Sequence, residues 1–467
     1  MRIPFQRNRI AAALGAAALA LAAAPHALAT GFQLNEQSAS SIGNANAAGA
    51  AFTDDITAMW FNPAALSAFD KRQGAAVVHI ITPKIEFSND ASQPARNQPL
   101  GNNGGDAGGV NVVPNMFVGI PINPQLAFGL GISTPFGLTT DYDEGWIGRY
   151  QALRSEIKTI NVNPAISWKA TPTFSVGVGV NYQYLDATLS QNVNYSGALL
   201  LAGQGAGLPA ATLAAIGAVT PGIDSKATIS ADDSAWGWNI GAAWDITPQV
   251  RFGASYRSKM KFHVKGNVDF NNPTVTLPPG TPPQLVGAVA QLSAGVNQAA
   301  LFNRSVTSDI ELPDIGNLSV LFRLNPQWEI MADAQWTGWS SIPELRFNTT
   351  PALTIIPLEW DDSWKIAVGA SYRINDQWKA RFGIAFDQTP ITSHPTPRLP
   401  DSDRWWFAIG AEYRYSPALK FDAGFVYIKG DSVDFNQNLG NTASFGLING
   451  SYDATTTIFS LQGVYSF

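Results

Sequence analysis

The stretch FSVGVGVNYQY, Phe174–Tyr184, decides the fold class. Apolar or aromatic residues occupy every second position, and the residues between them are Ser, Gly, Asn and Gln. A period of two is the geometry of a β-strand whose two faces meet different surroundings. Aromatic residues at both ends of the apolar face are typical of strands that cross a membrane. A soluble β-sandwich also alternates, but it rarely begins and ends its apolar faces with Trp or Tyr so regularly.

The same pattern recurs in later stretches of the chain, namely 328–336, 364–374 and 378–386. Aromatic residues make up 11% of the chain and charged residues only 14%, against about 25% charged in an ordinary soluble domain. Mean hydropathy is nevertheless −0.01. This composition favours a membrane β-barrel, in which each strand shows one face to lipid and the other to a polar lumen.

A short turn motif recurs between the strands and sets their number. Its six copies are Asn123-Pro124-Gln125, Thr171-Pro172-Thr173, Thr247-Pro248-Gln249, Asn325-Pro326-Gln327, Asn375-Asp376-Gln377 and Ser416-Pro417-Ala418. Pro presets a turn dihedral, and Asn, Ser or Thr can cap the turn. Six tight turns separate seven pairs of strands. The sequence therefore predicts an all-β fold, a 14-stranded antiparallel transmembrane barrel over residues 71–467, with the tight turns in the periplasm.

Two long connections, 192–225 and 271–303, are apolar although the barrel topology places them outside the cell. Both have partly helical patterns. A membrane helix is the alternative for the first, but its Gly, Pro and Gln content disfavours that interpretation. Apolar external loops indicate a surface that captures hydrophobic molecules.

The two ends of the chain carry targeting features. Residues 1–29 have the basic start, apolar middle and Ala27-Leu28-Ala29 cleavage site of a secretory signal peptide, and an uncleaved membrane anchor is the alternative. Cleavage leaves 26 basic and 35 acidic residues, a net charge near −9, which disfavours nucleic acid as a partner. The final strand ends on Phe467, the kind of terminal aromatic residue that barrel-assembly machinery recognises in outer-membrane proteins.

Several kinds of chemical site are not expected. The chain has no cysteine, so disulfides and thiolate metal sites are excluded. His79, His263 and His394 are far apart and lack metal-ligand spacing. The pairs Asp54-Asp55 and Asp361-Asp362 are interpreted as solvated loop carboxylates. We expect no cofactor, no metal and no enzymatic activity.

Four motifs make the chain resemble the FadL family, the outer-membrane transporters of long-chain fatty acids and other hydrophobic compounds. They are Gly31-Phe32-Gln33-Leu34-Asn35-Glu36, Asn62-Pro63-Ala64, Pro135-Phe136-Gly137-Leu138, and Trp405 with the closing aromatic strand. The resemblance covers essentially all of the mature chain. It implies a barrel whose N-terminal residues, here 30–70, form a hatch or plug in the lumen. It also implies substrate capture between two external loops and lateral release through a kinked third strand.

The N-terminal segment and the third strand both have compositions that fit these expectations. A barrel of fourteen strands is wide enough to need filling, and the Ser-, Asn- and Ala-rich segment Gly31–Phe69 suits a polar lumen. It has too few large apolar residues to form a separate soluble domain. Pro135 and Gly137 interrupt the third strand, and unpaired backbone in a closed barrel indicates a distortion or an opening.

The candidate ligand and gating residues follow from the resemblance. They are Asn62, Pro63, Ala64, Pro135, Phe136, Gly137 and Arg346. An ordinary Asn-Pro turn is the alternative for the first three, and a solvated strand-end arginine is the alternative for Arg346. Arg346 aligns with a basic residue that faces the ligand carboxylate in the family. A second basic position of the family is Gln191 here, which leaves a neutral hydrocarbon cargo open.

The main hypothesis is passive uptake of long-chain fatty acids or similar hydrophobic molecules across the bacterial outer membrane, by a monomer without covalent chemistry. Uptake of aromatic or alkane hydrocarbons is the alternative within the family. A surface adhesin and an outer-membrane hydrolase are the alternatives from other classes. A hydrolase would require a Ser or Asp beside one of the three histidines at the rim of the lumen.

Overall fold

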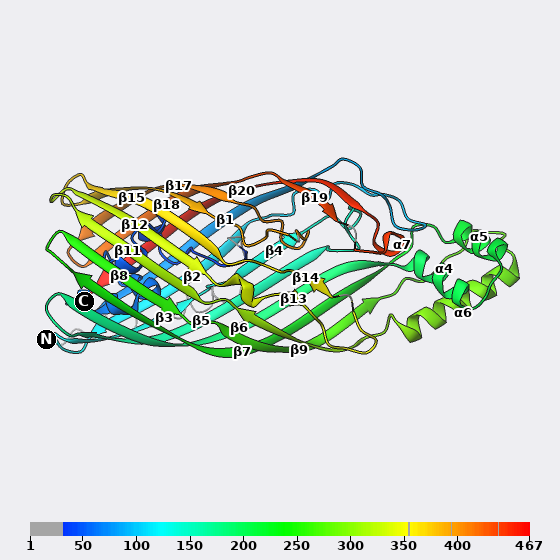
Figure 1. Cartoon of the computed structure of the whole chain (residues 1–467), viewed down its shortest axis with the longest axis horizontal. Coiled ribbons are helices and arrows are strands. Elements are labelled where there is room, and N and C mark those ends of the chain that lie inside the picture. Colours follow the sequence, from blue (N-terminus) through cyan, green and yellow to red (C-terminus); the bar gives the residue numbers. More distant parts are fainter. Residues whose placement is uncertain (1–30, 354, 394, 438) are drawn as a thin grey trace, which may run out of the picture.

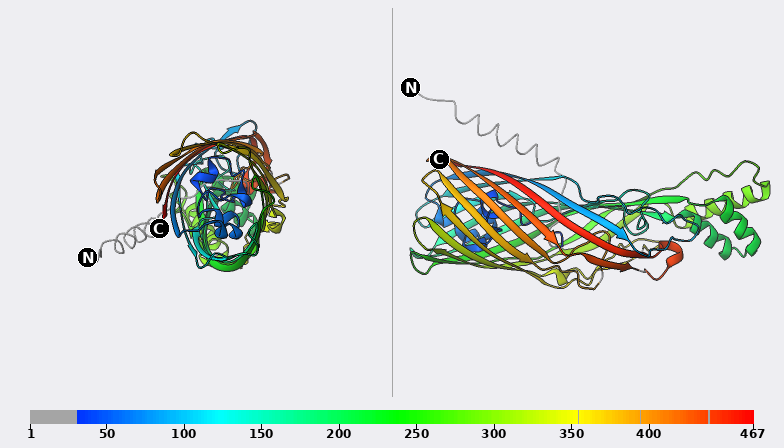
Figure 2. Two further views of the ribbon diagram at one scale, coloured as in Figure 1. Left: turned by 90° about the vertical axis from the view of Figure 1, so that its left-hand side faces the viewer. Right: turned by 90° about the horizontal axis from the view of Figure 1, so that it is seen from above.

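The fold is a closed antiparallel barrel with helices projecting beyond one end (Figures 1 and 2). The structure, a computed structural model, describes residues 31–467 except 354, 394 and 438. The predicted signal peptide, residue 30 of the predicted hatch and His394 therefore lie outside the described residues. No helix in the described part of the chain combines the length and hydropathy that a membrane-spanning helix needs.

Fourteen strands form the barrel, which confirms the predicted fold class. Ten run without interruption: β1 (Gln73–Asn89), β2 (Asn111–Pro121), β5 (Arg154–Lys169), β6 (Phe174–Asn194), β7 (Asp224–Asp245), β12 (Trp328–Thr337), β15 (Ser363–Arg373), β16 (Trp378–Asp387), β17 (Arg404–Ser416) and β20 (Ile448–Ser466). Four are each divided into two segments: β3 (Leu126–Ser133) with β4 (Gly137–Asp141), β8 (Val250–Arg257) with β9 (Met260–Asn271), β10 (Arg304–Leu312) with β11 (Ile315–Arg323), and β18 (Leu419–Gly430) with β19 (Val433–Gln437). The first strand pairs with the last, from Gln73 opposite Ser466 to Asn89 opposite Gly450, and this ladder closes the barrel.

All six expected tight turns join neighbouring antiparallel strands. In the turn before β12, the Asn325 side chain accepts hydrogen bonds from the backbone N–H groups of Gln327 and Trp328, both at 2.9 Å. The Asn375 side chain does the same in the turn before β16. The Asn at the start of the motif thus fixes the turn, and with it the register of the following strand.

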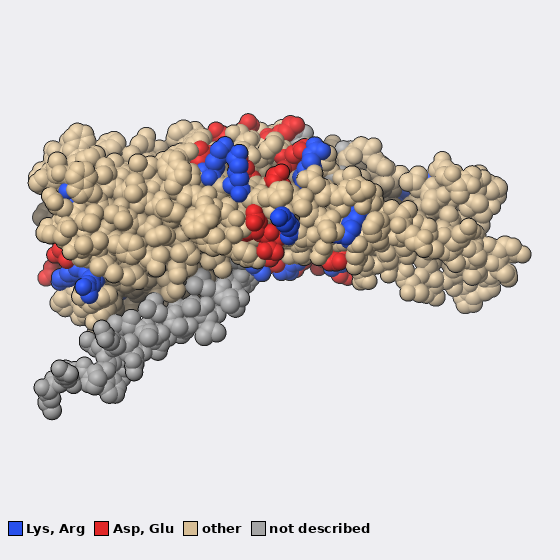
Figure 3. Space-filling model, turned by 90° about the horizontal axis from the view of Figure 1, so that it is seen from below, with Lys and Arg blue, Asp and Glu red and all other residues tan. Residues whose placement is uncertain are grey.

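The outward face of the barrel is apolar and the inward face is polar. Val178, Phe382 and Ile409 are 49–55% exposed, whereas Asn181 and Arg381 on the inward face are fully buried. Aromatic pairs lie at the ends of the apolar faces, such as Trp328–Tyr372 with ring centroids 4.6 Å apart. Figure 3 shows a broad uncharged belt between charges at the turn end and a second charged zone farther along the barrel.

Residues 31–69 fill the turn end of the lumen with short helices (Figure 2). The helices are α2 (Ala39–Ile42), η2 (Gly49–Ala51), α3 (Ala58–Phe61) and η3 (Pro63–Ala68), and most of their residues are buried. Inward-facing glycines of the wall admit this segment at close range. A Cβ atom on Gly177 would lie 2.4 Å from the carbonyl carbon of Pro63, and one on Gly383 would lie 2.2 Å from that of Asn44. The inward-facing glycines therefore leave the room that the backbone of the lumen segment occupies.

Two carboxylates of this lumen segment correct a sequence-based expectation. Asp54 and Asp55 were expected to be solvated, but Asp55 is fully buried and Asp54 lies in the same network of charges. Asp54 contacts Lys379 and Arg381 at 2.9 Å each, and Asp55 contacts Lys420 at 3.2 Å. The cationic partners lie more than 320 residues away along the chain, so no local pattern could reveal them. Paired burial of these charges ties the lumen segment to β16 and β18.

Replacing Gly383 with valine is expected to displace residues 31–69 without preventing barrel formation. The added methyl groups would overlap the backbone of Asn44, and overpacking of this kind costs about 1–3 kcal/mol or more. Limited proteolysis of the folded protein should then cleave within residues 31–69. Gly74→Val is the matched control, because a Cβ atom at Gly74 meets nothing within 4 Å. Equal protease resistance of both variants would contradict the proposed fit.

The long connections carry the helices that project from the other end of the barrel (Figure 1). They are α4 (Tyr195–Gly205), α5 (Ala210–Val219) and α6 (Pro283–Ala299), and their contacts bury Leu199, Ile216 and Val296. Strand β6 continues to Asn194 and β7 begins at Asp224, so the first connection is slightly shorter than expected. The remaining elements at this end are η4 (Trp339–Ser341), the hairpin β13 (Glu344–Leu345) and β14 (Ile356–Pro357), and α7 (Thr442–Phe445).

Candidate functional site

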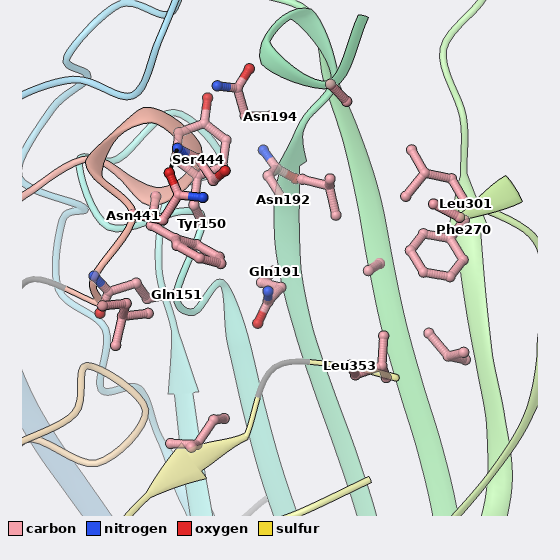
Figure 4. Close-up of a pocket in the computed structure, with 18 of the residues that line it drawn as sticks. Tyr150, Gln151, Gln191, Asn192, Asn194, Phe270, Leu301, Leu353, Asn441 and Ser444 are labelled. Carbon is pink, nitrogen blue, oxygen red and sulfur yellow. Dashed lines mark hydrogen bonds between the residues drawn. The ribbon is translucent and has the colours of Figure 1, made fainter. Parts of the chain in front are cut away.

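A cavity of about 430 Å³ opens at the helical end of the barrel. Figure 4 shows Phe270 and Leu301 on one side of it, Tyr150, Asn441 and Ser444 on the other, and Gln191 between them. Arg96, Arg304 and Arg398 also line the cavity, and none of the described lining residues is acidic. Three arginines with no carboxylate among the described lining residues favour an anion in this cavity.

A second, narrower space of about 60 Å³ continues from this cavity into the barrel. The two share lining residues, namely Leu189, Ile229, Phe347, Ile356, Thr396 and Arg398. Farther in, the walls are almost entirely apolar, with Ile157, Val264, Ile310 and Trp360 among them. The inner end reaches Phe32 and Leu138. This apolar lining suits a hydrocarbon chain, and Arg398 lies at the junction of the wide and narrow parts.

Arg398 is a buried guanidinium without a carboxylate partner among the described residues. It lies in the connection between β16 and β17 and is 6% exposed. Its Nη2 donates to the Gln191 side-chain oxygen at 2.6 Å, and its Nη1 makes longer contacts to Ser155 Oγ at 3.3 Å and the Ser190 carbonyl at 3.4 Å. The Nε has no hydrogen-bond partner among the residues that the structure describes. Burial lowers the pKa of Arg398 to about 10, so the group remains charged at neutral pH.

Arg304 supplies a second positive charge nearer the mouth of the cavity. It donates to the backbone carbonyls of Ala300, Phe302 and Pro351, each at 3.0 Å. Its guanidinium carbon lies 5.0 Å from the ring centroid of Phe302. Carbonyl groups do not neutralise the charge, so Arg304 also remains available to an approaching anion.

Aromatic side chains close the inner end of the narrow space. The ring of Phe32 lies 5.0 Å from Trp339, 5.9 Å from Trp360 and 5.9 Å from Phe136, measured between centroids. Phe32 belongs to the lumen segment and Phe136 to the interruption between β3 and β4. The floor of the cavity is therefore made where the N-terminal segment meets the irregular strand.

The barrel ladder is incomplete at this interruption. Strand β2 pairs with β3 only over Met116–Pro121, and β4 pairs with β5 but with no part of β2 in the described structure. The backbone of the interruption pairs inward instead. Leu34 N–H donates to the Pro135 carbonyl and Gly137 N–H to the Phe32 carbonyl, both at 2.8 Å. Residues 32–34 thus cover the unpaired part of the wall from inside.

The predicted residues Asn62, Pro63 and Ala64 lie within the lumen segment and do not line either cavity. The fully buried Asn62 side chain donates to the carbonyls of Ala50 at 2.7 Å and Ala242 at 2.9 Å. Its oxygen accepts from Ala64 N–H at 2.9 Å and so caps η3, with Pro63 at the favoured first helical position. The structure places this motif where it fastens the lumen segment to β7.

Arg346, predicted to face a ligand carboxylate, is exposed and pairs with Glu344 at 2.6 Å. Its neighbour Phe347 lines the cavities, but the guanidinium does not. The Gln191 side-chain oxygen accepts a hydrogen bond from Arg398 and so orients that guanidinium. Sequence reasoning missed Arg398 because it follows no strand or turn pattern. The sequence offered one sign of a fixed arginine at this position. Arg398 lies between Pro397 and Pro400, in a connection that joins two paired strands, β16 and β17.

The histidines of the described part of the chain lie outside the two cavities. His79 Nδ1 lies 2.6 Å from Ser460 Oγ, but both residues are fully buried and neither lines the cavities above. His263 contacts Asp309 on the outward face of the barrel. Across residues 31–467, the three masked positions aside, no cluster of His, Asp or Glu has the arrangement of a metal site.

Comparison with known proteins gives concordant matches along the chain. Residues 20–467 match the family model for outer membrane protein transport protein (OMPP1/FadL/TodX). The long-chain fatty acid transport protein of Escherichia coli K12 is 30% identical over 438 residues, covering 90% of this chain and 93% of that protein. Outer membrane protein P1 of Haemophilus influenzae is 28% identical, with 96% and 97% coverage.

Solved structures add a comparison of the fold. A Pseudomonas aeruginosa FadL homologue superposes with a TM-score of 0.80 at 26% identity, covering 93% of this chain and 99% of that one. The Pseudomonas putida toluene transporter TodX has a TM-score of 0.61 at 15% identity, covering 88% and 94%. The second likeness concerns the fold alone.

Proposed function

We propose that this chain, which belongs to the OMPP1/FadL/TodX family of outer membrane transport proteins, imports long-chain fatty acids. It is a bacterial outer-membrane β-barrel that transports hydrophobic compounds, and its family consists of channels and not of enzymes. The proposal concerns the cargo, a long-chain fatty acid.

The observation that carries the proposal is the buried, unpaired charge of Arg398. A buried guanidinium without a counter-ion is costly, and an entering carboxylate would accept a pair of charge-assisted hydrogen bonds from it. The apolar side chains between Arg398 and Phe32 would line the path of the alkyl chain. A neutral aromatic such as toluene would leave the charge unpaired, so the cavity favours a carboxylate over the hydrocarbon alternative.

The proposed route runs from the external helices through the two cavities to the interruption between β3 and β4. Apolar side chains of α4 and the following connections lead into the wide cavity. Each methylene that leaves water gains about 0.8 kcal/mol, so release into water is disfavoured for a long chain. Release into lipid retains that gain. We therefore propose that the cargo leaves sideways, between β2 and β4, when residues 32–34 withdraw from Pro135–Gly137.

We also propose a partner in assembly and the oligomeric state in which the chain acts. The last residue, Phe467, is 54% exposed at the end of β20, where barrel-assembly machinery could bind it before insertion. The chain is proposed to act as a monomer, because the lumen, the cavities and the wall interruption all lie within one barrel.

Uptake by cells that lack other transporters of this family tests the proposed cargo. Expression of the protein should give saturable uptake of labelled palmitate, and myristate should compete for it. Toluene at equal concentration should compete at least tenfold less well, because it cannot pair with Arg398. Accelerated toluene uptake without palmitate uptake would overturn the proposal. An empty vector and a vector that expresses an unrelated porin provide the controls.

A further inference from the structure

Another buried arginine without a carboxylate partner among the described residues lies deeper in the barrel, within a polar patch on the inward faces of neighbouring strands. Arg257 on β8 is 6% exposed and has no carboxylate within ion-pair distance in the described structure. It donates to the Asn181 side-chain oxygen and, at 3.0 Å, to the Trp60 carbonyl. Its guanidinium carbon lies 3.8 Å from the centroid of the Trp60 ring. The positive charge is therefore held in place but not neutralised.

Asparagine side chains extend the patch across β5, β6 and β7. Asn181 Nδ2 and Asn163 Nδ2 each donate to Asn239 Oδ1 at 3.0 Å, and Asn161 Nδ2 donates to Asn181 Oδ1 at 3.2 Å. Gly179 makes room for these amides, because a Cβ atom there would lie 2.5 Å from Asn239 Oδ1. The wall is thus built to gather four amides beside one arginine.

Much of the hydrogen-bonding capacity of the patch is unused. Within the described part of the chain, the buried atoms of the patch without a hydrogen-bond partner are Ser133 Oγ, Asn161 Oδ1, Asn163 Oδ1, Asn239 Nδ2 and both polar atoms of the Gln183 side chain. Buried polar groups in folded proteins are nearly always paired with protein, water or a ligand. Several unpaired groups around one uncompensated charge therefore indicate a site for a polar, negatively charged group with its water.

The position of the patch indicates what would occupy it. Ser133 is the last residue of β3 and pairs with Asn161, and Gly131 pairs with Asn163. The patch thus begins in the ladder rows next to the interruption at Thr134–Phe136, beside the proposed exit. A carboxylate that leaves Arg398 would otherwise have to cross this part of the lumen unpaired.

We infer that Arg257, with Gln183 and Asn239, forms a transient second station for the hydrated carboxylate of the cargo on its way to the lateral exit. The inference rests on the proposed fatty-acid function. Arg398 would set the affinity of the resting protein, and the deeper station would set the rate of passage. Free donors remain for the carboxylate at Asn239 and Gln183, and water that accompanies it would satisfy the amide oxygens of Asn161 and Asn163.

Two measurements on folded variants test the inference, namely the palmitate dissociation constant of purified protein and the initial rate of palmitate uptake. Arg257→Met is expected to lower the uptake rate about tenfold and leave the dissociation constant within twofold. Arg251→Met is the matched control, since Arg251 is a buried arginine of the same strand that pairs with Asp245 at 3.0 Å. It should leave both quantities unchanged. A parallel loss of affinity and rate in Arg257→Met would overturn the inference.

Gln183→Leu keeps the test decisive if Arg257→Met fails to fold. The polar atoms of the Gln183 side chain have no hydrogen-bond partner among the described residues, so its replacement removes no internal hydrogen bond. We expect a two- to threefold lower uptake rate with an unchanged or higher Tm. An unchanged rate with a raised Tm would show that the patch binds nothing during transport and would contradict the inference. If the wild-type protein neither binds nor imports palmitate, the proposed function itself fails, which is a distinct result.

Discussion

Replacing Arg398 with methionine is expected to weaken palmitate binding by about 10- to 100-fold. Hydrogen bonds to a charged group contribute about 1.5–3 kcal/mol, and each 1.4 kcal/mol corresponds to a tenfold change in affinity. Methionine retains most of the apolar stem and removes the charge and the N–H donors. Titration of purified protein with a fluorescent or labelled long-chain fatty acid measures the change.

The fold should survive this substitution. Replacing a buried charge that lacks a counter-ion with an apolar residue is often neutral or stabilising. The Tm of Arg398→Met should therefore equal or exceed that of the wild type. Arg346→Met is the matched control, because Arg346 is exposed, pairs with Glu344 and should change palmitate affinity less than twofold. Equal losses of affinity in the two variants would place the carboxylate away from Arg398.

Joining the N-terminal segment to the strand interruption with a disulfide is expected to reduce palmitate uptake more than tenfold. Gln33 and Phe136 form an isolated antiparallel bridge, flanked by the hydrogen bonds from Leu34 to Pro135 and from Gly137 to Phe32. This is the arrangement of a non-hydrogen-bonded pair, in which Cα atoms lie about 4.5 Å apart. That separation is within the range of natural disulfides, about 4.4–6.8 Å.

The chain contains no cysteine, so Gln33→Cys with Phe136→Cys would create the only thiol pair. Oxidation should hold residues 32–34 against the wall and close the proposed exit, and a reductant should restore uptake in the same protein. Because oxidised and reduced forms share the Phe136 substitution, their comparison isolates the effect of the bond. Palmitate binding should persist in both forms. Unimpaired uptake by the oxidised protein would contradict release through the interruption.

The barrel itself was predictable because its physical causes are local and periodic. Alternation along stretches such as 378–386 follows from a wall between lipid and lumen, and turns such as Asn375-Asp376-Gln377 carry their own capping side chain. Repeating units of this kind can be counted without knowledge of long-range contacts. The interruption at Pro135–Gly137 was visible for the same reason, since Pro and Gly act on their own strand.

The chemistry of the lumen was not predictable in this way, because it depends on residues that are distant along the chain. Asp54 meets Lys379 and Arg381 only after the barrel closes around the lumen segment. Arg398 and Gln191 meet across 207 positions, which is why the amide at 191 suggested a lost charge instead of a support for another one. Irregular connections have no periodicity, so their side chains could be placed only by the structure.

A crystal structure of the protein with bound palmitate tests the central claim most directly. We expect carboxylate oxygens within about 3 Å of the Arg398 Nη atoms, the usual distance of charge-assisted pairs, and an alkyl chain that extends past Ile157 and Val264 toward Phe32. A palmitate that lies in the cavity with its carboxylate away from Arg398, or with its tail toward the external helices and its head at Phe32, would contradict the account.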